Sequence, residues 1–322
     1  MPTERRTKAK PRERQPSSLN QLKPTISIIG AGRLGTALAL ALNRRGYRVE
    51  AIMARRLAHA RRAAATIDAH AQPLSATQLD ALPNSRLVFI TTPDDQIAHV
   101  AARLAASLEK REGSAQSRTA LHCSGALSSD VLSPLRAQGF ATGSMHPLVS
   151  ISDASQGALS LRGAFYCIEG ASAAVRIARA LVRDLGGESF SINSRDKALY
   201  HAAAVMASGH MVALFDIAVE MLRHCGLKEK RAHAVLLPLV KSMLKNLSTL
   251  DAAHALTGTF ARADTATMLR HLDALSTSSI GDALGVYRLL GKRSLRLAEK
   301  LGVDGEALKK IGRVLEEFEG DA

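Results

Sequence analysis

The sequence contains no tryptophan, and only 3% of its residues are aromatic. Proteins that bind single-stranded nucleic acid commonly stack the bases on exposed aromatic rings. The scarcity of such rings argues against a binding platform of this kind. Hydrophobic residues make up 46% and charged residues 22% of the 322 positions, which is typical of a globular protein and not of a disordered chain.

Cysteine is also scarce. Cys123, Cys167 and Cys225 form an odd set without a CxxC pair, which argues against a disulfide scaffold and against a metal site. The pattern is typical of a protein in the reducing cytoplasm. Cys123 follows a histidine and could serve as a nucleophile, but a small buried strand residue is the interpretation we favour.

The charge balance is strongly basic, with a formal net charge of +14. Residues 1–23 hold seven Lys or Arg against two Glu in a stretch rich in proline and polar residues, which predicts a disordered tail. This stretch has no apolar run of the kind found in secretory signals. The remaining excess is spread along the chain, which favours small anionic ligands over nucleic acid.

Only one apolar segment, residues 202–222, approaches the length of a membrane span. It contains His210, Asp216 and Glu220 and many small residues, and charged groups are rare inside membranes. We therefore expect a buried core helix and no membrane association.

What the sequence does contain is a glycine-rich turn after a short apolar run at residues 26–29. An Ala- and Leu-rich helical stretch follows and ends at Gly46, and a second apolar run covers residues 47–53. A GxGxxG pattern in such a β-turn-α-β unit predicts a dinucleotide site, with the pyrophosphate at the helix N-terminus. The expected cofactor-binding residues of this turn are Gly30, Ala31, Gly32, Arg33, Leu34 and Gly35.

The end of the second run indicates which dinucleotide is bound. NAD enzymes usually place an acidic residue about 20 positions after the glycines to bind the ribose 2′-hydroxyl. Arg55 and Arg56 stand there instead. Guanidinium groups suit the 2′-phosphate of NADP(H), although these arginines could also merely solvate the start of a helix.

Further strands are predicted at 86–95, 119–125, 141–147, 164–170 and 188–192, and helical stretches such as 95–110 and 171–186 separate them. This alternation predicts an α/β fold with a doubly wound, mainly parallel Rossmann sheet. Ligands of such sheets bind beyond the C-terminal ends of the strands. The residues expected to line that crevice, with the nicotinamide between the two histidines, are Thr91, Thr92, Pro93, His122, Ser124 and His146.

From about Asn193 the strand pattern ends and helical segments follow one another. The sequence thus predicts a basic tail, a Rossmann domain and an all-α C-terminal domain. A helix of about 30 residues is expected between Ser194 and Gly226. The predicted boundaries are 1–23, 24–192 and 193–322, with later helices at 229–248, 264–275, 281–301 and 305–318.

The first long helix carries polar residues at helical spacing. Lys197, His201, Ala204 and Ser208 fall on one narrow stripe of this helix. The stripe could face a cofactor and a substrate. A solvated lysine and a capped histidine on a buried helix would give the same pattern.

With these residues in view, the chain resembles a bacterial family of oxidoreductases that joins a Rossmann-like domain to an all-helical C-terminal domain of uncharacterised function. The similarity covers most of residues 25–290. The stretches that carry it are "IIGAGRLGTALALAL", "LHCSGALSSDVLSPLRAQGFATGSMHPL", "DKALYHAAAVMASGHMVALF", "LLPLVKSMLKN" and "ALTGTFARADTATMLRHLDAL".

The architecture of that family is similar to pyrroline-carboxylate reductase, prephenate dehydrogenase and 6-phosphogluconate dehydrogenase, and some members are regarded as alternative ketopantoate reductases. The resemblance implies NADP(H)-linked reduction of a small anionic oxo acid, and a homodimer formed through the helical domain. One position departs from the family, which often has Asn where this chain has Gly209.

Hydride transfer to a carbonyl leaves negative charge on oxygen, so a reductase needs a proton donor or cation nearby. We expect Lys197 as the general acid, with His122, Ser124 and His146 orienting the substrate. His201, Ser208 and Arg262 are the expected substrate-binding residues, and the Arg262 guanidinium suits a carboxylate. His146 could instead cap a strand, and Arg262 could form an ion pair with Asp264.

Rossmann domains also serve as sensors, in which NADP(H) binding alters a partner interaction and no hydride moves. A sensor has no need of a lysine and two histidines beside the nicotinamide. These three groups favour the enzyme over the sensor. Nucleic-acid binding is a more distant alternative that would depend on the basic tail.

Overall fold

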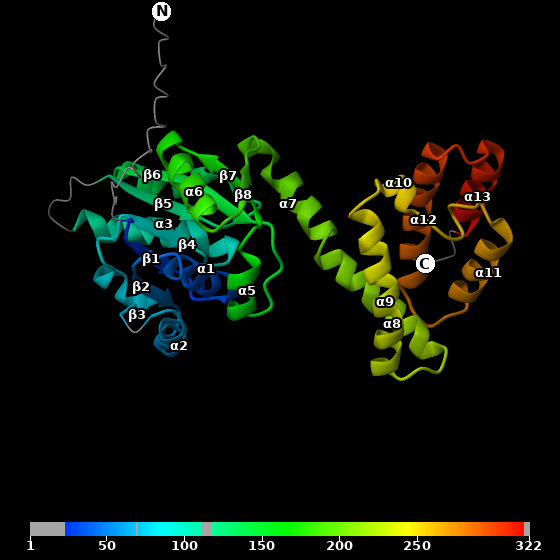
Figure 1. Ribbon diagram of the computed structural model, residues 1–322, viewed down its shortest axis with the longest axis horizontal. Coiled ribbons are helices and arrows are strands. Elements are labelled where there is room, and N and C mark those ends of the chain that lie inside the picture. Colours follow the sequence, from blue (N-terminus) through cyan, green and yellow to red (C-terminus); the bar gives the residue numbers. More distant parts are fainter. Residues whose placement is uncertain (1–22, 69, 111–116, 319–322) are drawn as a thin grey trace, which may run out of the picture. The chain divides into compact units, whose positions relative to one another are not determined.

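The computed structural model describes residues 23–68, 70–110 and 117–318, which form parts of two compact units, residues 1–204 and 205–322 (Figure 1). The two units are described separately below. The predicted tail lies outside the described residues except for Lys23, whose ammonium forms an ion pair with Asp184 at 2.9 Å.

The described part of the first unit is built on an eight-stranded sheet in the order β3-β2-β1-β4-β5-β6-β7-β8. All neighbouring strands are parallel except β6 and β7, which are antiparallel. The doubly wound, mainly parallel sheet predicted from the sequence is therefore confirmed. The strands are β1 (Ile26–Ile29), β2 (Val49–Ala54), β3 (Gln72–Ser75), β4 (Leu87–Ile90), β5 (Arg118–His122), β6 (Phe140–Pro147), β7 (Phe165–Gly170) and β8 (Glu188–Phe190).

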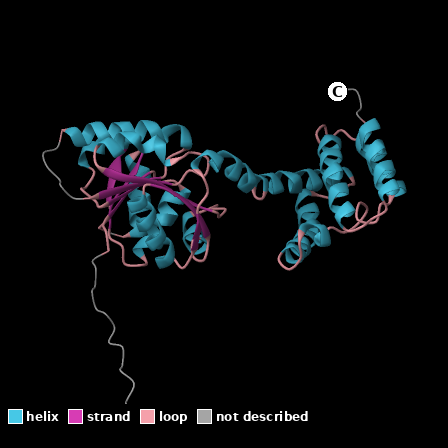
Figure 2. Cartoon of the chain, turned by 90° about the horizontal axis from the view of Figure 1, so that it is seen from above, coloured by secondary structure: helices cyan, strands magenta, loops and turns pink. Residues whose placement is uncertain are grey.

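Helices cover both faces of this sheet, as Figures 1 and 2 show. Side chains of α1, α2, α5 and α6 pack in one hydrophobic core, and those of α3 and α4 pack in the other. Strands buried on both faces are nearly all apolar, which explains the short β-branched runs in the sequence. The helices and 3₁₀ segments are α1 (Arg33–Asn43), α2 (Leu57–Ile67), η1 (Ala76–Ala81), α3 (Asp94–Glu109), η2 (Ser129–Leu132), α4 (Ser133–Ala137), α5 (Ala154–Ser160), α6 (Ser172–Asp184) and η3 (Ser194–Asp196).

The reversal of direction between β6 and β7 matters for the site. It places Glu169 of β7 directly opposite Ser144 of β6 in the register, and Cys167 opposite His146. Glu169 and Cys167 are distant in sequence from β5, the strand that ends at His122. The pairing of β6 with β7 brings them to the same level of the sheet. Glu169 thus reaches the C-terminal ends of the parallel strands from the opposite direction.

The second unit is helical. Its small core contains Met268 and Leu272 of α11 and Ile311 and Leu315 of α13. The four later helices predicted from the sequence are found with ends within about two residues of the expected ones. The helices are α8 (Gly209–His224), α9 (Glu229–Leu247), α10 (Ala252–Ala255), α11 (Thr265–Ser276), α12 (Ala283–Lys300) and α13 (Gly305–Glu317), and α7 (Lys197–Met206) crosses the boundary between the units.

The boundary between the units falls after Ala204 and not at the expected position 192/193. The end of the strand pattern does mark the start of the helices. However, the first turns of α7 still pack on the sheet, and Lys197 at the start of α7 is completely buried there. The stripe of polar residues is therefore divided between the two units.

The prediction of a buried core helix at residues 202–222 is wrong for this chain taken alone. The helical stretch Ser194–His224 has a mean hydropathy of 1.7 but only 6% of that apolar window is buried. By length and composition this one stretch is able to cross a membrane, which by itself is weak support for a membrane protein. The core of the second unit forms around α11 and α13, and it leaves Val212 of α8 exposed.

The same stretch differs from a single 30-residue helix in two details. It is broken before α8, where Ser208 has φ −129° and ψ −79°, and Asn193 occupies the N-cap position in place of Ser194. Its predicted end is confirmed, because Gly226 has φ +90°, a left-handed conformation that favours glycine after a helix.

Candidate active site

The turn between β1 and α1 requires glycine for steric reasons. Gly30 has φ +123°, and a Cβ there would lie 2.6 Å from the carbonyl carbon of Thr91. A Cβ on Gly35 would collide with the carbonyl oxygen of Gly30. Gly32 is different, since nothing lies within 4 Å of its Cβ position. The first and third glycines allow the packing, and the second leaves open space above the turn.

The N-terminus of α1 faces that open space. Gly32 is its N-cap residue and offers no side-chain cap, and the first turn of α1 contains no acidic residue. The first N–H groups of any helix lack partners within the helix, and together with the helix dipole they favour an anion. The arrangement suits a pyrophosphate.

A pocket of about 750 Å³ opens beside this turn, at the C-terminal ends of β1, β2 and β4. Of the expected cofactor-binding residues it brings together Gly30, Ala31, Gly32, Arg55, Thr91, Thr92 and Pro93. Arg33, Leu34, Gly35 and Arg56 are not part of its lining.

The pocket also contains polar residues that were not expected from the sequence: His59, Asp95, Gln96, His99 and Arg103. All of them lie on α2 or α3, the helices that follow β2 and β4. The sequence signal for them was their position on the helices that follow β2 and β4, two strands that end at the crevice. Arg103 already donates to the carbonyl oxygen of Ala76 at 3.0 Å, so its guanidinium is partly engaged.

These residues fit an adenine dinucleotide that carries a 2′-phosphate. Arg55 provides the cation at the end of β2, where no carboxylate lines the pocket. The Thr92 hydroxyl is buried without a hydrogen-bond partner among the described residues, so it is available to a ligand.

A second group of polar residues adjoins the pocket through Asp94. This residue lies between Pro93 and Asp95, which both line the pocket, and it accepts a hydrogen bond from the Ser124 hydroxyl at 2.7 Å. Ser124 Oγ in turn accepts from the backbone N–H groups of Ala126 and Leu127. Ser124 thus holds the loop after β5 in place and connects it to the start of α3.

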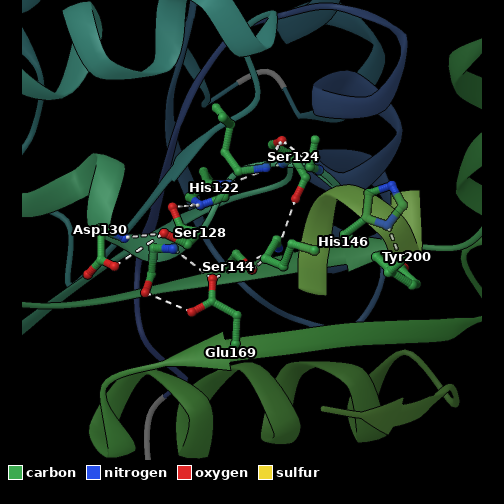
Figure 3. Close-up of polar contacts among 12 residues, drawn as sticks. His122, Ser124, Ser128, Asp130, Ser144, His146, Glu169 and Tyr200 are labelled. Carbon is green, nitrogen blue, oxygen red and sulfur yellow. Dashed lines mark hydrogen bonds and ion pairs between the residues drawn. The ribbon is translucent and has the colours of Figure 1, made fainter. Parts of the chain in front are cut away.

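His122, at the end of β5, is completely buried and has both ring nitrogens engaged (Figure 3). Nδ1 accepts from the backbone N–H of Ser124 at 3.2 Å, and Nε2 lies 3.1 Å from the carbonyl oxygen of Ser128. An accepting Nδ1 and a donating Nε2 define a neutral ring. Burial and the nearby Lys197 charge lower the pKa of His122 to about 4.

Lys197, at the start of α7, is also completely buried. Its ammonium donates to Ser144 Oγ at 2.6 Å and to the Ser124 carbonyl oxygen at 3.2 Å, and it lies 3.9 Å from Glu169 Oε1. Burial lowers the pKa of Lys197, and Glu169 opposes this effect. Glu169 is fixed by the backbone N–H and the hydroxyl of Ser129, at 2.7 and 2.9 Å.

His146, near the end of β6, has a different environment. Its Nδ1 lies 2.7 Å from the Tyr200 hydroxyl (Figure 3). Its ring packs edge-on against His201. Its Nε2 faces Gly125, where a Cβ would lie only 2.9 Å away and would also collide with His201 Nδ1. Burial, followed by His201 and Lys197, lowers the pKa of His146 to about 4.

The structure thus brings His122, Ser124, His146, Lys197 and His201 of the predicted site into one cluster in the first unit. Sequence reasoning missed several members of this cluster. Asp94 fell at the end of the expected strand 86–95 and was not singled out. Tyr200 lies one helical turn after Lys197, beside the predicted stripe of polar residues. Glu169 gave no signal, because only the antiparallel β7 brings it here. The residues added by the structure are Asp94, Gly125, Ser144, Glu169 and Tyr200.

The remaining predicted site residues have other surroundings. Ser208 is the N-cap residue of α8, and Arg262 is exposed in the turn before α11, both in the second unit. Asp264 caps α11 by accepting from Thr267 N–H, which lowers the pKa of its carboxyl group. Burial raises the pKa of Cys123 to about 12, which favours the structural interpretation of this thiol.

In the described ranges, no three or more His, Cys, Asp or Glu side chains are grouped so that they could hold a metal ion. The polar cluster is held together by hydrogen bonds of its own residues. It lies directly beside a pocket with the shape and charge for a dinucleotide.

Comparison with known proteins agrees with this division of the chain. Residues 10–147 match the model of a Rossmann-like domain, and residues 164–294 match a domain of unknown function, DUF2520. No functionally curated protein matches the chain.

Solved structures of other proteins share the fold, among them the following three. A protein from Thermotoga maritima is 24% identical, with a TM-score of 0.65 over 85% of this chain and 98% of its own. A Bacteroides fragilis protein assigned as an NADP oxidoreductase is 22% identical, with a TM-score of 0.67 over 84% and 98%. A reductive aminase from Aspergillus terreus, in complex with NADPH and ethyl levulinate, is 16% identical, with a TM-score of 0.53 over 92% and 93%.

The order of the two matched domains is the one that the resemblance of the sequence implied. The chain is therefore a Rossmann-like domain protein with a C-terminal DUF2520 domain.

Proposed function

We propose that this protein is an NADP(H)-dependent oxidoreductase that reduces the carbonyl or imine group of a small oxo acid, similar to a ketopantoate reductase. One observation carries the proposal: the glycine turn opens into a pocket with Arg55, and Asp94 connects that pocket to the cluster of His122, His146 and Lys197. A binding site for a redox cofactor thus adjoins side chains of the types that donate and accept protons in enzymes.

The structures that share the fold support this class of reaction. The Bacteroides fragilis protein is assigned as an NADP oxidoreductase, and the structure of the Aspergillus terreus enzyme contains NADPH. At these identities the similarity shows the fold alone. The cofactor is therefore proposed from the residues of the pocket, in particular from Arg55 and the open space at Gly32.

A bound dihydronicotinamide supplies a hydride to the substrate carbon. The residues of the chain then have to stabilise the negative charge that forms on the substrate oxygen or nitrogen. The buried Lys197 ammonium provides positive charge in a region from which water is excluded, where charges act more strongly than in water. The neutral imidazole of His146 adds hydrogen-bonding capacity without competing for that charge.

The proposal is tested first by calorimetry with NADPH and NADH. NADPH uptake is expected, followed by oxidation of the bound cofactor with at least one member of a panel of 2-oxo acids and cyclic imines. Tight NADPH binding without oxidation by any of them would favour the sensor. No uptake of either dinucleotide would refute both.

Removing the buried charge is the second test. Lys197→Ala is expected to lower turnover by about 100-fold, the usual scale for a lost acid–base or charge-stabilising group. The affinity for NADPH is expected to stay near wild type, since Lys197 does not line the pocket. Arg195→Ala, two residues away on an exposed side chain, is the matched control and leaves turnover unchanged.

We further propose that the protein is a cytoplasmic homodimer that associates through the second unit. Large apolar side chains of α8 and α9, such as Val212 and Leu239, are exposed there and would be covered by a second copy. Leu239→Glu is expected to shift sedimentation from dimer to monomer, with Lys241→Glu on the same helix as control. A wild-type chain that sediments as a monomer refutes the dimer.

A further inference from the structure

The sequence leaves three groups able to pass a proton to the substrate: Lys197, His122 and His146. The three groups differ in whether an N–H remains that does not already face a partner within the chain. An ammonium has three N–H bonds. Those of Lys197 face Ser144, Ser124 and Glu169, and none of its surface is exposed.

His122 is equally committed. One ring nitrogen accepts from the backbone of the loop after β5, and the other donates to the carbonyl oxygen of Ser128. The ring has no exposed surface. His122 therefore holds the loop of residues 123–128 through its two hydrogen bonds to the backbone, and it has no nitrogen left for a ligand.

His146 remains. It is half-buried, only Nδ1 has a hydrogen-bond partner within the described chain, and Nε2 faces the backbone of Gly125. Gly125 packs closely against both rings, because a Cβ there would lie 2.9 Å from His146 Nε2 and would collide with His201 Nδ1. Neither nitrogen has a hydrogen-bond partner among the described residues, but only His201 Nδ1 is completely buried, so Nε2 of the half-buried His146 is the nitrogen that a ligand can reach.

Tyr200 determines where the proton of His146 resides. Its ring is held edge-on by Phe190 of β8, at 5.9 Å between centroids, and its hydroxyl lies 2.7 Å from Nδ1. Burial and Cys167, which also hydrogen-bonds this hydroxyl, raise the pKa of Tyr200, so the phenol keeps its proton. Because a thiol sulfur is a weak acceptor, the phenol donates to the imidazole nitrogen Nδ1. A ring that accepts at Nδ1 carries its own hydrogen on Nε2, the nitrogen that faces Gly125.

We propose that neutral His146, held in the Nε2–H form by Tyr200, is the proton donor to the reduced substrate. This assignment rests on the proposed reductase function, and it makes Lys197 a positioning residue that holds the Ser124 loop and supplies charge. Neutral imidazole is a known electrophile toward carbonyl oxygen in enzymes.

The proton balance of the step is closed. Hydride from the reduced nicotinamide forms the new C–H bond, and the π electrons of the C=O or C=N bond move to oxygen or nitrogen. The Nε2–H bond of His146 breaks and its proton goes to that atom. The phenol proton of Tyr200 moves to Nδ1, and the phenolate recovers a proton from water.

The charged groups around His146 agree with a neutral ring. Lys197, Tyr200 and His201 face it from α7, His122 lies on the neighbouring β5, and Cys167 is its register partner on β7. The two carboxylates of this cluster are engaged elsewhere, since Glu169 lies at the Lys197 ammonium and Asp94 accepts from the Ser124 hydroxyl. Together with burial, the positive neighbours lower the pKa of His146 to about 4.

The decisive measurement is ¹⁵N NMR of histidine-labelled protein without cofactor, with the His146 signals identified by their loss in His146→Gln. The expected spectrum has the Nε2–H pattern from pH 8 down to about pH 5. In Tyr200→Phe a mixture of both tautomers is expected. A dominant Nδ1–H form, or an imidazolium at pH 6, overturns the inference, whatever the turnover.

Turnover supplies the second readout. Tyr200→Phe is expected to lower kcat about tenfold, the size of one lost hydrogen bond, and His146→Gln about 100-fold, with NADPH affinity unchanged in both. The matched control is Tyr287→Phe, because Tyr287 bonds His271 Nδ1 at 2.8 Å in the same edge-on geometry within the second unit. It is expected to leave kcat unchanged.

The two failures are distinguishable. If wild-type protein binds and oxidises NADPH but His146→Gln retains full turnover, the donor is wrong and the reductase stands. A kcat that falls as the pH rises through about 6.5 would also refute a neutral donor, because it would indicate a donor that must be positively charged. If the Nε2–H form is found but NADPH does not bind, the proposed function fails and the proton-transfer role fails with it.

Discussion

The two units of the molecule use hydrophobic residues in opposite ways. In the first unit, Leu38 of α1 and Phe89 of β4 have no exposed surface and belong to the same hydrophobic core. In the second unit, Leu239 of α9 is 67% exposed and Val212 of α8 is 70% exposed. Most of the exposed large apolar side chains of the described residues lie in the second unit, which thus presents apolar surface that a monomeric soluble protein rarely leaves uncovered.

The same contrast holds for polar residues. The first unit buries Lys197, His122, Ser124 and Ser144 and satisfies them with hydrogen bonds. Buried polar groups reduce stability unless they are paired, so such a cluster is retained where a site depends on it. We therefore propose that the first unit holds the chemistry and that the second unit serves assembly.

The largest expected effect compares one leucine from each unit. Leu38→Ala is expected to lower the free energy of unfolding of the first unit by about 2–5 kcal/mol, because it leaves a cavity in a closed core. Leu239→Ala at low protein concentration is expected to change it by less than about 0.5 kcal/mol. Urea unfolding followed by hydrogen exchange reports on both units. A large loss for Leu239→Ala that appears only at high concentration would show that a second copy covers this face.

Acid is expected to destabilise the first unit. The folded-state pKa of His122 is lowered to about 4 by burial, so below pH 6.5 the unfolded chain binds a proton that the folded chain does not. The stability from neutral His122 is thus fully present above pH 6.5 and is lost as the pH falls toward 4, by about 1.4 kcal/mol per pH unit.

Urea unfolding at pH 7 and pH 5 measures this slope. His122→Gln is expected to reduce it. His271→Gln, at an exposed histidine of the second unit, is the control and leaves the slope as it is. Equal slopes in wild type and His122→Gln would contradict a neutral buried ring.

A smaller effect separates two adjacent arginines. Arg55→Ser is expected to weaken NADPH binding about tenfold and to leave NADH binding unchanged, because Arg55 lines the pocket and a lost charged hydrogen bond is of this size. Arg56→Ser is the matched control, since Arg56 is exposed outside the lining. Calorimetry measures both, and equal losses would contradict the assignment of Arg55 to the 2′-phosphate.

The smallest effect concerns the thiols. Cys123 and Cys167 of the first unit are buried, and Cys225 of the second unit is exposed. Native protein is expected to take up one alkylating group per chain, at Cys225, and Cys123→Ala is expected to retain turnover within about twofold because a buried thiol is not a reactive one. Mass spectrometry locates the label, and rapid labelling of Cys123 would reopen its role as a nucleophile.

Much of this fold could be predicted from the sequence because its signals are local. The run at residues 26–29, the glycines after it and the alternation of strands and helices each depend on short stretches, and Gly226 ends its helix as expected. The short β3 was missed, and so was the exposure of α8 (Gly209–His224). Apolar composition does not distinguish a helix buried in its own chain from one that a second chain would cover.

The candidate site was predictable to the extent that it follows the strand ends. His122, Ser124 and His146 were found because parallel strands end at one edge of the sheet. Glu169 could not be found, since its position depends on the reversed direction of β7. The roles of Lys197 and His146 also could not be separated, because hydrogen-bond satisfaction depends on three-dimensional neighbours.

Gly125 leaves no room for a methyl group between His146 and His201. A related sequence with alanine at this position would therefore need a smaller residue in place of His201 or a displaced β6. Glycine at 125 and histidine at 201 are thus expected to covary among homologues, so that a family alignment would record this proximity even where no structure exists.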